Sequence, residues 1–278
     1  SADVSSGVDA ATGEVAGVAI EAAATVTFAA QKIGLHIAPG KHCAGSVKLA
    51  TLPYPTGWPV VPCGHLLGDE AVSALPARAA GSTKFTSGHV IVAGGSTGLS
   101  GAPILAASGA MRSGAGYVSA CVPSSVAPAV DAHLAEAMTP AMPGPAGTHD
   151  VRNAQAVLEL VSRRGGAIVA GPGLGREQGA GEFLIELLAA EAPIVIDADG
   201  LAALGERPEQ VAHRRAPTVL TPHAGELARL LGSSSDEVEA HRLRSVLSLA
   251  ERAQCVVVLK GDDTLIAAQG RQVMVSRG

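Results

Sequence analysis

From about residue 89 onward, short apolar runs alternate with loops that are rich in glycine or polar residues. The runs that favour strands are His89–Ala93, Gly116–Val122, Ala167–Ala170, Pro193–Ile196, Thr218–Leu220 and Val256–Leu259. Apolar runs with this punctuation predict an α/β fold with a mostly parallel sheet and helices on both faces. In such sheets ligands bind at the carboxyl ends of the strands, so we expect the chemistry to lie in the loops there.

The rest of the pattern is consistent with this fold. Helices are expected near 102–112, 182–190 and 226–231, a short helix after Asp199, and a terminal hairpin over 264–268 and 272–275. Upstream, Thr25–Ala30 and Ser46–Thr51 favour strands. The stretch 53–62 contains four prolines and a glycine, which exclude regular structure. We therefore expect a linker or domain boundary there.

Composition limits the classes of protein and ligand. The chain is 47% hydrophobic but only 2% aromatic, so its core must be built from Ala, Val, Leu and Ile. Its net charge of -5 provides no general attraction for nucleic acid or an anionic membrane. No apolar run is long enough to span a bilayer, and the first residues do not resemble a signal peptide. A cytoplasmic protein is the default expectation.

The four cysteines are far apart and form no Cys-x-x-Cys pair. This spacing argues against a disulfide framework and against a zinc site. Buried, unreactive thiols are the expectation for Cys43, Cys63, Cys121 and Cys255.

Two glycine-rich loops follow strands directly. One is Gly171–Gly175 (GPGLG), and the other contains Gly94, Gly95 and Ser96. Glycines allow sharp turns that present backbone N–H groups to an anion, and the following helix adds its positive end. Each loop alone could equally be a tight turn that requires a positive φ. Two such loops at equivalent ends of one sheet favour a phosphate-binding site.

Polar residues follow three further strands. His223 and Glu226 lie in TPHAGE, where the histidine could be an ordinary surface or capped residue or a catalyst, and the glutamate a favourable charge in the first helical turn. Lys260 could meet a nucleotide phosphate or simply be exposed in a hairpin. Asp197 and Asp199 could hold Mg²⁺, act as acid and base, or cap the next helix.

The order of these motifs resembles a known family. GGSTGLSGAPILAASGAMRSGAGYV, GPGLG, IDADGL, LTPHAGELARLLG and VVLKGDDTLIA are similar to the ATP- or ADP-dependent NAD(P)H-hydrate dehydratases, from about Leu75 onward. ADVSSGVDAATGEVAG, TVTFAAQKIG and APGKHCAG resemble the end of an NAD(P)H-hydrate epimerase domain. The resemblance implies a ribokinase-like dehydratase domain over 83–278, a linker and first helix over 56–82, and a Rossmann-like epimerase remnant over 1–55.

The resemblance also implies site residues. The hydrate would contact Ala102, the glycines Gly171, Gly173 and Gly175, and His223. The adenylate would contact the segment formed by Lys260, Gly261, Asp262, Asp263 and Thr264. In the epimerase part, Asp3 would contact substrate and Ser6 would be a K⁺ ligand. The implied reaction is the ATP- or ADP-dependent dehydration of the S-form of NAD(P)H hydrate back to NAD(P)H, with Mg²⁺ neutralising phosphate charge. Homo-oligomers are expected only from the resemblance.

Departures from the family pattern qualify these expectations. Thr83, Lys84 and Phe85 stand where the family has His-Lys-Gly, and Ser5 replaces a proline of the epimerase motif. The family's Gly-Thr-Gly-Asp motif, which contains the catalytic Asp, would follow Gly278. The resemblance therefore assigns no catalytic residue within the chain, and we expect impaired turnover. A ribokinase-like kinase of a vitamin precursor and a non-catalytic nucleotide-binding oligomer remain alternatives.

Overall fold

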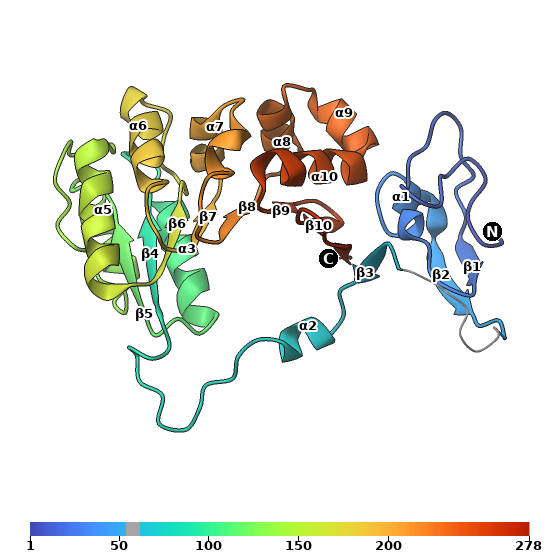
Figure 1. Cartoon of the computed structure of the whole chain (residues 1–278), viewed down its shortest axis with the longest axis horizontal. Coiled ribbons are helices and arrows are strands. Elements are labelled where there is room, and N and C mark those ends of the chain that lie inside the picture. Colours follow the sequence, from blue (N-terminus) through green and yellow to red (C-terminus); the bar gives the residue numbers. More distant parts are fainter. Residues whose placement is uncertain (54–61, 278) are drawn as a thin grey trace. The chain divides into compact units, whose positions relative to one another are not determined.

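The computed structural model, drawn in Figure 1, describes residues 1–53 and 62–277. The chain divides into two compact units. Unit 1 comprises Ser1–Leu75 together with His223–Gly278, and unit 2 comprises Pro76–Pro222. The proline-rich stretch 53–62, where we expect a linker, lies largely outside the described residues. The three domain ranges inferred from the resemblance stay a prediction.

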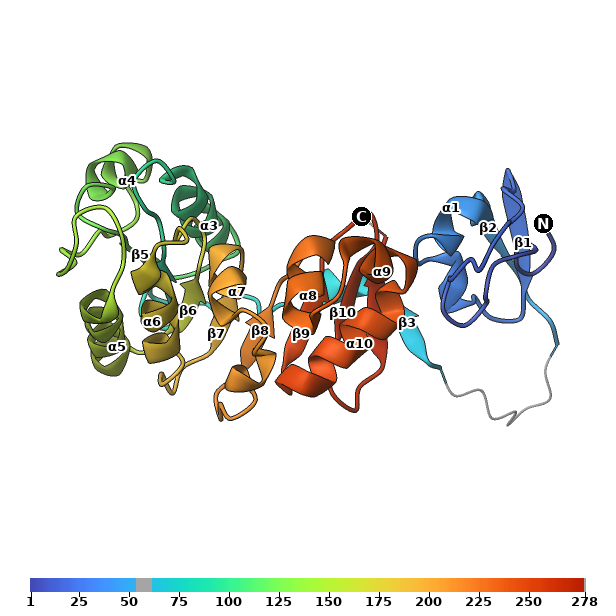
Figure 2. The same cartoon turned by 90° about the horizontal axis from the view of Figure 1, so that it is seen from above.

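Unit 2 is built on five parallel strands in the order β5-β4-β6-β7-β8. Their bounds are β4 His89–Ala93, β5 Tyr117–Cys121, β6 Ala167–Ala170, β7 Ile194–Ile196 and β8 Thr218–Leu220. Neighbouring strands lie side by side in Figures 1 and 2. The predicted parallel sheet is confirmed, and all five strands fall on the apolar runs from which they were predicted.

Helices connect these strands. Their bounds are α3 Gly101–Arg112, α4 Ala127–His133, α5 Val151–Arg164, α6 Gln178–Leu187 and α7 Asp199–Leu204, with a 3₁₀ turn η2 at Pro208–Val211. The helix expected near 102–112 is confirmed. The helix expected near 182–190 begins earlier, at Gln178, and α4 and α5 were not predicted at all.

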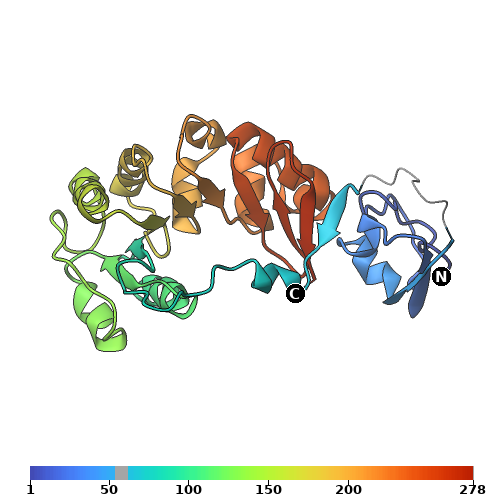
Figure 3. The ribbon, with the colours of Figure 1, turned by 60° about the horizontal axis from the view of Figure 1, so that its bottom comes forward.

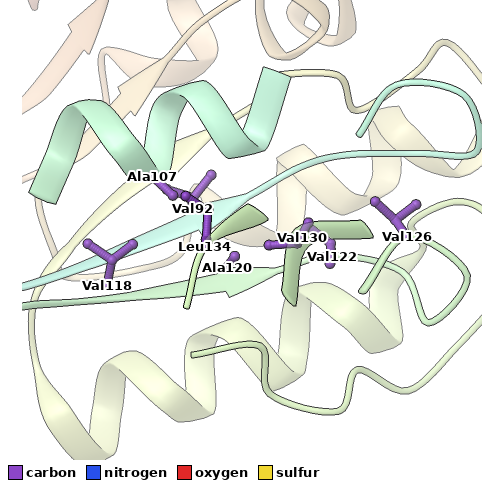
Figure 4. Close-up of a cluster of buried hydrophobic side chains, with 8 residues drawn as sticks. All are labelled: Val92, Ala107, Val118, Ala120, Val122, Val126, Val130 and Leu134. Atoms are coloured by element: carbon purple, nitrogen blue, oxygen red, sulfur yellow. The ribbon is translucent and has the colours of Figure 1, made fainter. Parts of the chain in front are cut away.

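Helices cover both faces of the sheet in unit 2. On one face, Ala107 of α3 and Val130 of α4 join a buried cluster with Val92 and Val118 from the strands (Figure 4). On the other face, the His89 side chain contacts the carbonyl of Gly165, which ends α5, at 3.3 Å. Successive strand residues point to opposite faces, which explains how β4 serves both layers.

The N-terminal part of unit 1 pairs two parallel strands, β1 Ala24–Phe28 and β2 Ser46–Ala50. Between them lie the 3₁₀ turn η1 Ile33–Leu35 and the short helix α1 Gly40–Ala44. Both strands match the extended runs expected from the sequence. Thr25 and Thr27 are buried, and the Thr25 hydroxyl donates to the carbonyl of Ala44 at 2.6 Å.

The C-terminal part of unit 1 contains three helices and a small sheet. The helices are α8 Ala224–Leu231, α9 Ser235–Ala240 and α10 Arg242–Ala253, and the strands are β9 Val256–Leu259, β10 Thr264–Ala267 and β11 Val273–Ser276. β9, β10 and β11 pair antiparallel, so the terminal hairpin is confirmed (Figure 3). β3 Gly64–Leu66 pairs parallel with β11, and α2 spans Glu70–Ser73.

The thiols only partly match the expectation. Cys121 and Cys255 are buried, and burial raises the pKa of each thiol to about 12, which keeps them protonated and unreactive. Cys63 is exposed and Cys43 is half-buried, so the expectation of burial is wrong for these two. All four are free thiols. Among the described helices, none combines the length and apolar character that crossing a bilayer would require.

Candidate functional site

Three loops of unit 2 converge beyond the carboxyl ends of β4, β6 and β7. The N–H of Gly95 donates to the carbonyl of Pro172 at 2.9 Å, which joins the first two loops. A Cβ atom on Gly173 would lie 3.3 Å from that of Ala102 and only 2.6 Å from the carbonyl oxygen of Leu99. With φ at 65°, Gly173 therefore needs to be glycine both for its backbone conformation and for this close approach.

Asp199 connects the third loop to the glycine loop. Its Oδ2 accepts a hydrogen bond from the N–H of Gly175 at 3.0 Å, and its Oδ1 lies 3.5 Å from Nε of Arg176. Asp199 is the first residue of α7 and follows the N-cap residue Ala198, so it does not occupy the capping position. Of the alternatives left open for the paired aspartates, capping is therefore not how Asp199 is used. Asp199 instead fixes the Gly175 end of the loop.

The turn that carries Asp199 is strained. Ala198 adopts φ 51° and ψ −122°, a positive φ that residues with a Cβ atom rarely adopt. Such outliers persist where the surrounding structure holds them, and they are concentrated at functional sites. Here the strain occurs between the two aspartates of IDADGL, at the end of β7.

Two side chains hold the glycine loops: Ser96, which belongs to one of them, and His149, which no sequence motif singled out. The hydroxyl of buried Ser96 donates to the carbonyl of Gly173 at 3.0 Å. His149, which is 1% exposed, places Nε2 2.8 Å from the carbonyl of Gly94, and its ring packs against Phe183. Burial lowers the pKa of His149, so the ring is neutral and Nε2 carries the donating hydrogen.

The glycine loop keeps a donor for a ligand. Gly173 is buried, yet within the part of the chain that the structure describes its N–H donates to no acceptor. The neighbouring N–H groups of Gly171, Leu174 and Gly175 are all bonded, to Ala93, Gly171 and Asp199. Because nearly all buried backbone groups are paired in folded proteins, an unpaired N–H in a glycine loop is suited to an anion.

In unit 1, His223 and Glu226 form a capping box at the start of α8. Nδ1 of His223 accepts from the N–H groups of Gly225 at 3.0 Å and Glu226 at 3.4 Å. In return, Oε2 of Glu226 accepts from the N–H of His223 at 2.8 Å. His223 is therefore the N-cap residue of α8, and Glu226 lies in the first helical turn, where a favourable charge was expected. The His223 side chain is still 60% exposed, with Nε2 3.6 Å from Glu226 Oε1, and can meet a ligand.

The segment from Lys260 to Thr264 is tied into unit 1. Nζ of Lys260 lies 3.9 Å from Oε2 of Glu226. The carboxylate of Asp262 pairs with Lys41 and His42, each at 2.9 Å. These hydrogen bonds, that of Lys41 first, lower the pKa of Asp262. Thr264 is half-buried at the start of β10.

Asp263 is completely buried and has a structural partner. Its Oδ2 lies 3.3 Å from Nε of Arg242, whose side chain is 2% exposed, and its carbonyl accepts from Nη2 of the same arginine at 2.7 Å. A Cβ atom on Gly261 would lie 2.5 Å from that Nη2, so a side chain at this position would displace the guanidinium. The Asp263 carboxylate thus faces the protein interior and presents no surface to a ligand.

The N-terminal candidates lie in unit 1. Asp3 has φ 65°, and its Oδ1 accepts from Lys32 and, at 3.1 Å each, from the Thr27 hydroxyl and the N–H of Phe28. The bond from Lys32 is the largest cause that lowers the pKa of Asp3. Ser6 is exposed, and its carbonyl accepts from the N–H of Ile20 at 2.9 Å.

The predicted residues therefore form separate groups. Unit 2 brings together Ala102, Gly171, Gly173 and Gly175. Unit 1 brings His223 to Glu226 and Lys260, and it holds Asp262 and Asp263 against the N-terminal segment and α10. Among the described residues, no three His, Cys, Asp or Glu side chains cluster closely enough to hold a metal ion.

Two family models match the chain. One, described as NAD(P)H-hydrate dehydratase, matches residues 90–277, and the other, described as YjeF-related protein N-terminus, matches residues 1–34. The first range contains the glycine loops, His223 and the Lys260 segment. The second contains Asp3 and Ser6.

Similar proteins point to the same family. The bifunctional NAD(P)H-hydrate repair enzymes Nnr of Salinibacter ruber and Thermofilum pendens are 38% and 36% identical to the chain and match 99% and 96% of it. The match covers 52% and 51% of those relatives, so the chain spans about half their length.

Solved structures show the same fold. One is the ADP/ATP-dependent NAD(P)H-hydrate dehydratase of Bacillus subtilis, co-crystallised with ATP/Mg²⁺. It superposes with a TM-score of 0.64 at 29% identity, and the superposition covers 77% of this chain and 73% of the B. subtilis chain. A ribokinase-like superfamily protein of Enterococcus faecalis superposes with a TM-score of 0.65 at 22% identity over 79% of this chain and 73% of its own, which supports the ribokinase-like fold.

Proposed function

Because the chain belongs to the NAD(P)H-hydrate dehydratase family, we propose that it binds hydrated NAD(P)H together with ATP or ADP and serves the dehydration of the hydrate back to NAD(P)H. The observation that carries this proposal is the construction of the glycine loop in unit 2. Three loops, a buried serine and a buried histidine hold Gly171–Gly175 in place and leave the N–H of Gly173 for an anion.

In this proposal the hydrate is held by Ala102, by the glycines Gly171, Gly173 and Gly175, and by His223. The N–H of Gly173 suits an oxygen of the pyrophosphate of a dinucleotide, since it is a directed donor without a mobile side chain. Ala102 presents only a methyl group beside Gly173. His223 adds a donor from its exposed edge.

The adenylate is assigned to the segment from Lys260 to Thr264. Lys260 provides a positive charge for phosphate, and Gly261 allows the backbone to approach closely. Since the Asp263 carboxylate is buried against Arg242, that residue would act through its backbone. The B. subtilis dehydratase was co-crystallised with ATP/Mg²⁺, which supports an adenine nucleotide with Mg²⁺ for this chain.

The proposed reaction has two steps. The ring hydroxyl of the hydrate loses its proton to solvent as its oxygen attacks the terminal phosphorus of ATP; a new O–P bond forms, and ADP leaves as its bridging P–O bond breaks. The carbon–oxygen bond of the phosphorylated hydrate then breaks, and phosphate leaves with the hydroxyl oxygen. Loss of a proton restores the ring double bond of NAD(P)H. Phosphoryl transfer depends mainly on positioning and on neutralising charge, to which bound Mg²⁺ contributes.

The N-terminal segment supports a second proposed role. The match over residues 1–34 supports part of an epimerase domain, with Asp3 as a substrate contact and Ser6 as a K⁺ ligand. The carboxylate of Asp3 is held by three donors, so its charge is maintained and oriented. The exposed hydroxyl of Ser6 can provide one oxygen to K⁺.

Thermal unfolding in the presence of ligands tests the proposal. Two ligands are added separately: ATP with Mg²⁺, and NADPH as a probe for the hydrate. Each should raise the midpoint temperature of thermal unfolding. A ligand at 100 times its dissociation constant stabilises the folded state by about 2.7 kcal/mol, which corresponds to a shift of several degrees. NADPH with no effect beside a clear ATP shift would favour the kinase of a vitamin precursor.

Variants connect the shifts to the site. Gly173→Ala should abolish the NADPH shift, because the added Cβ meets the Leu99 carbonyl, whereas Gly109→Ala within α3 meets nothing within 4 Å and should leave it intact. Lys260→Ala should reduce the ATP shift, whereas Lys48→Ala on the exposed face of β2 should not. Equal effects of site and control variants would contradict the assignment.

A further inference from the structure

A cavity lies at the opposite end of the strands in unit 2 from the glycine loops. It has a volume of about 960 Å³, and its lining includes Gly116 and Tyr117 at the start of β5 and the residues that lead into β4. The glycine loops follow the carboxyl ends of β4 and β6. Because β4 has five residues at about 3.3 Å each, the length of a strand, roughly 15 Å, separates the two ends.

The cavity is strongly cationic. Arg78, Lys84, Arg163 and Arg164 line it, against a single carboxylate, Glu136. Arg163 pairs with Glu159, but among the described residues no carboxylate lies within ion-pair distance of Arg78, Lys84 or Arg164. In a unit that carries more acidic than basic residues, this concentration of unneutralised positive charge is local. It is suited to an anion such as phosphate.

Arg78 is also held in position. Its Nη2 donates to the carbonyls of Gly114 at 3.0 Å and Ala115 at 3.4 Å, where the chain passes from α3 to β5. A guanidinium has five N–H donors in a fixed plane, so these two bonds orient the group and leave donors for a ligand. Arg164 has a weaker contact, from Nη1 to the sulfur of Met138 at 4.0 Å.

The cavity also has an aromatic surface. The chain has only three phenylalanines, and one of them, Phe85, is 70% exposed and is not used in the core. Its ring meets that of Tyr117 edge to face, with centroids 5.8 Å apart at 71°, and Lys84 Nζ lies 5.2 Å from its centroid. The tyrosine ring is in turn stacked on His89 at 4.2 Å. An exposed ring that is fixed by its neighbours and flanked by cations provides a stacking platform.

We propose that this cavity is a second ligand site, which takes a small phosphate-bearing molecule with an aromatic ring, of the nucleoside monophosphate class. The phosphate would lie among Arg78, Lys84 and Arg164, and the base would stack on Phe85. The volume lies within the usual range of small-molecule sites. This site is independent of the hydrate and adenylate sites proposed above, since it shares no residue with them.

The basic residues also have a local role that the experiment must separate from ligand binding. Arg163 and Arg164 lie in the last turn of α5, where positive charge interacts favourably with the helix dipole. Arg112 has the same position at the end of α3, is exposed, and does not line the cavity. Arg112→Glu is therefore a matched control for Arg164→Glu, with the same change of charge in the same kind of position.

Calorimetric titration of the chain with AMP tests the proposal. Arg164→Glu should weaken one class of AMP site by about tenfold or more, and Phe85→Ala, which removes an exposed ring, by roughly fivefold or more. Arg112→Glu should change its affinity less than twofold, and Lys260→Ala should leave this class intact. Adenosine and inorganic phosphate should each bind more weakly than AMP.

Three results would overturn the proposal. They are an equal loss of AMP affinity in Arg112→Glu and Arg164→Glu, inorganic phosphate binding as tightly as AMP, and no site sensitive to Phe85→Ala. Circular dichroism of each variant verifies the fold, and Phe85→Ala provides the test should Arg164→Glu unfold. Failure of the adenylate proposal would appear separately, as the absence of an AMP site sensitive to Lys260→Ala.

Discussion

Replacing Arg242 by methionine removes the guanidinium that neutralises a buried carboxylate in unit 1. The Asp263 side chain is 0% exposed and that of Arg242 is 2% exposed, with Nε 3.3 Å from Oδ2. In the Arg242→Met variant, the hydrogen bond that remains to the Asp263 carboxylate from the described residues is that of the N–H of Ala38, 3.3 Å from Oδ1. The Asp263 carbonyl would also lose its bond from Nη2, which is 2.7 Å long.

The expected loss of stability is large. Breaking a buried ion pair by removing one partner typically costs about 3–5 kcal/mol, because the remaining charge stays buried without compensation. Methionine fills much of the space of the arginine stem, so the contribution of an empty cavity is small. The bond from Arg242 Nη1 to Glu239 Oε2 adds little, since the glutamate is 55% exposed and exposed pairs contribute at most about 1 kcal/mol.

Urea unfolding at neutral pH, followed by circular dichroism, measures the effect. Arg242→Met should lose about 3–5 kcal/mol, and the matched variant Glu239→Gln less than about 1 kcal/mol. Adding Asp263→Asn to Arg242→Met should recover part of the loss, because the amide removes the uncompensated charge and keeps an oxygen for Ala38. A loss below about 1 kcal/mol, or a double variant no more stable than the single one, would refute the reasoning.

Three further predictions concern other residues. Gly171→Ala should destabilise the chain by about 2 kcal/mol or more in thermal melts, since φ is 111° and the added Cβ would lie 2.1 Å from the Asp197 carbonyl oxygen; an unchanged midpoint would contradict this. His149→Ala should reduce the NADPH-induced shift by loosening Gly94, and His149→Gln should restore part of it if hydrogen bonding is the cause. Burial lowers the pKa of His36 to about 4, with smaller effects of Arg277 and Lys41. The unfolded chain therefore takes up a proton first, and stability falls as the pH decreases from about 6.5 toward 4. In the His36→Leu variant, the melting temperature should depend less on pH over this range. An unaltered slope of melting temperature against pH would contradict the assignment.

The parallel sheet could be predicted because each strand is a short apolar run followed by a loop of distinct composition. Helix α5 was missed although its start is encoded locally. Asp150 accepts from the N–H groups of Arg152 and Asn153, and Asn153 returns a bond to the N–H of Asp150. This is a capping box with Asp and Asn in place of the usual Ser or Thr and Glu, so the pattern could have been found.

The site was predictable only in part, because its supporting residues are distant in sequence. Glycine loops after strands indicated where a ligand binds. No local pattern indicates that His149 supports Gly94, or that Asp199 binds the N–H of Gly175 instead of capping α7. The same holds for Arg242, whose partner Asp263 follows 21 residues later. These contacts depend on how the loops meet in three dimensions.

The capping box at α8 determines what His223 can do chemically. Nδ1 accepts from two backbone N–H groups, so in the neutral ring the hydrogen must lie on Nε2. The exposed edge of the ring therefore offers a donor to a ligand oxygen and no lone pair for a proton. A neutral His223 can bind the hydrate or a phosphate, but it cannot deprotonate the hydroxyl while it caps the helix. Capping the helix thus determines the tautomer of His223, and this tautomer can serve the proposed site as a hydrogen-bond donor.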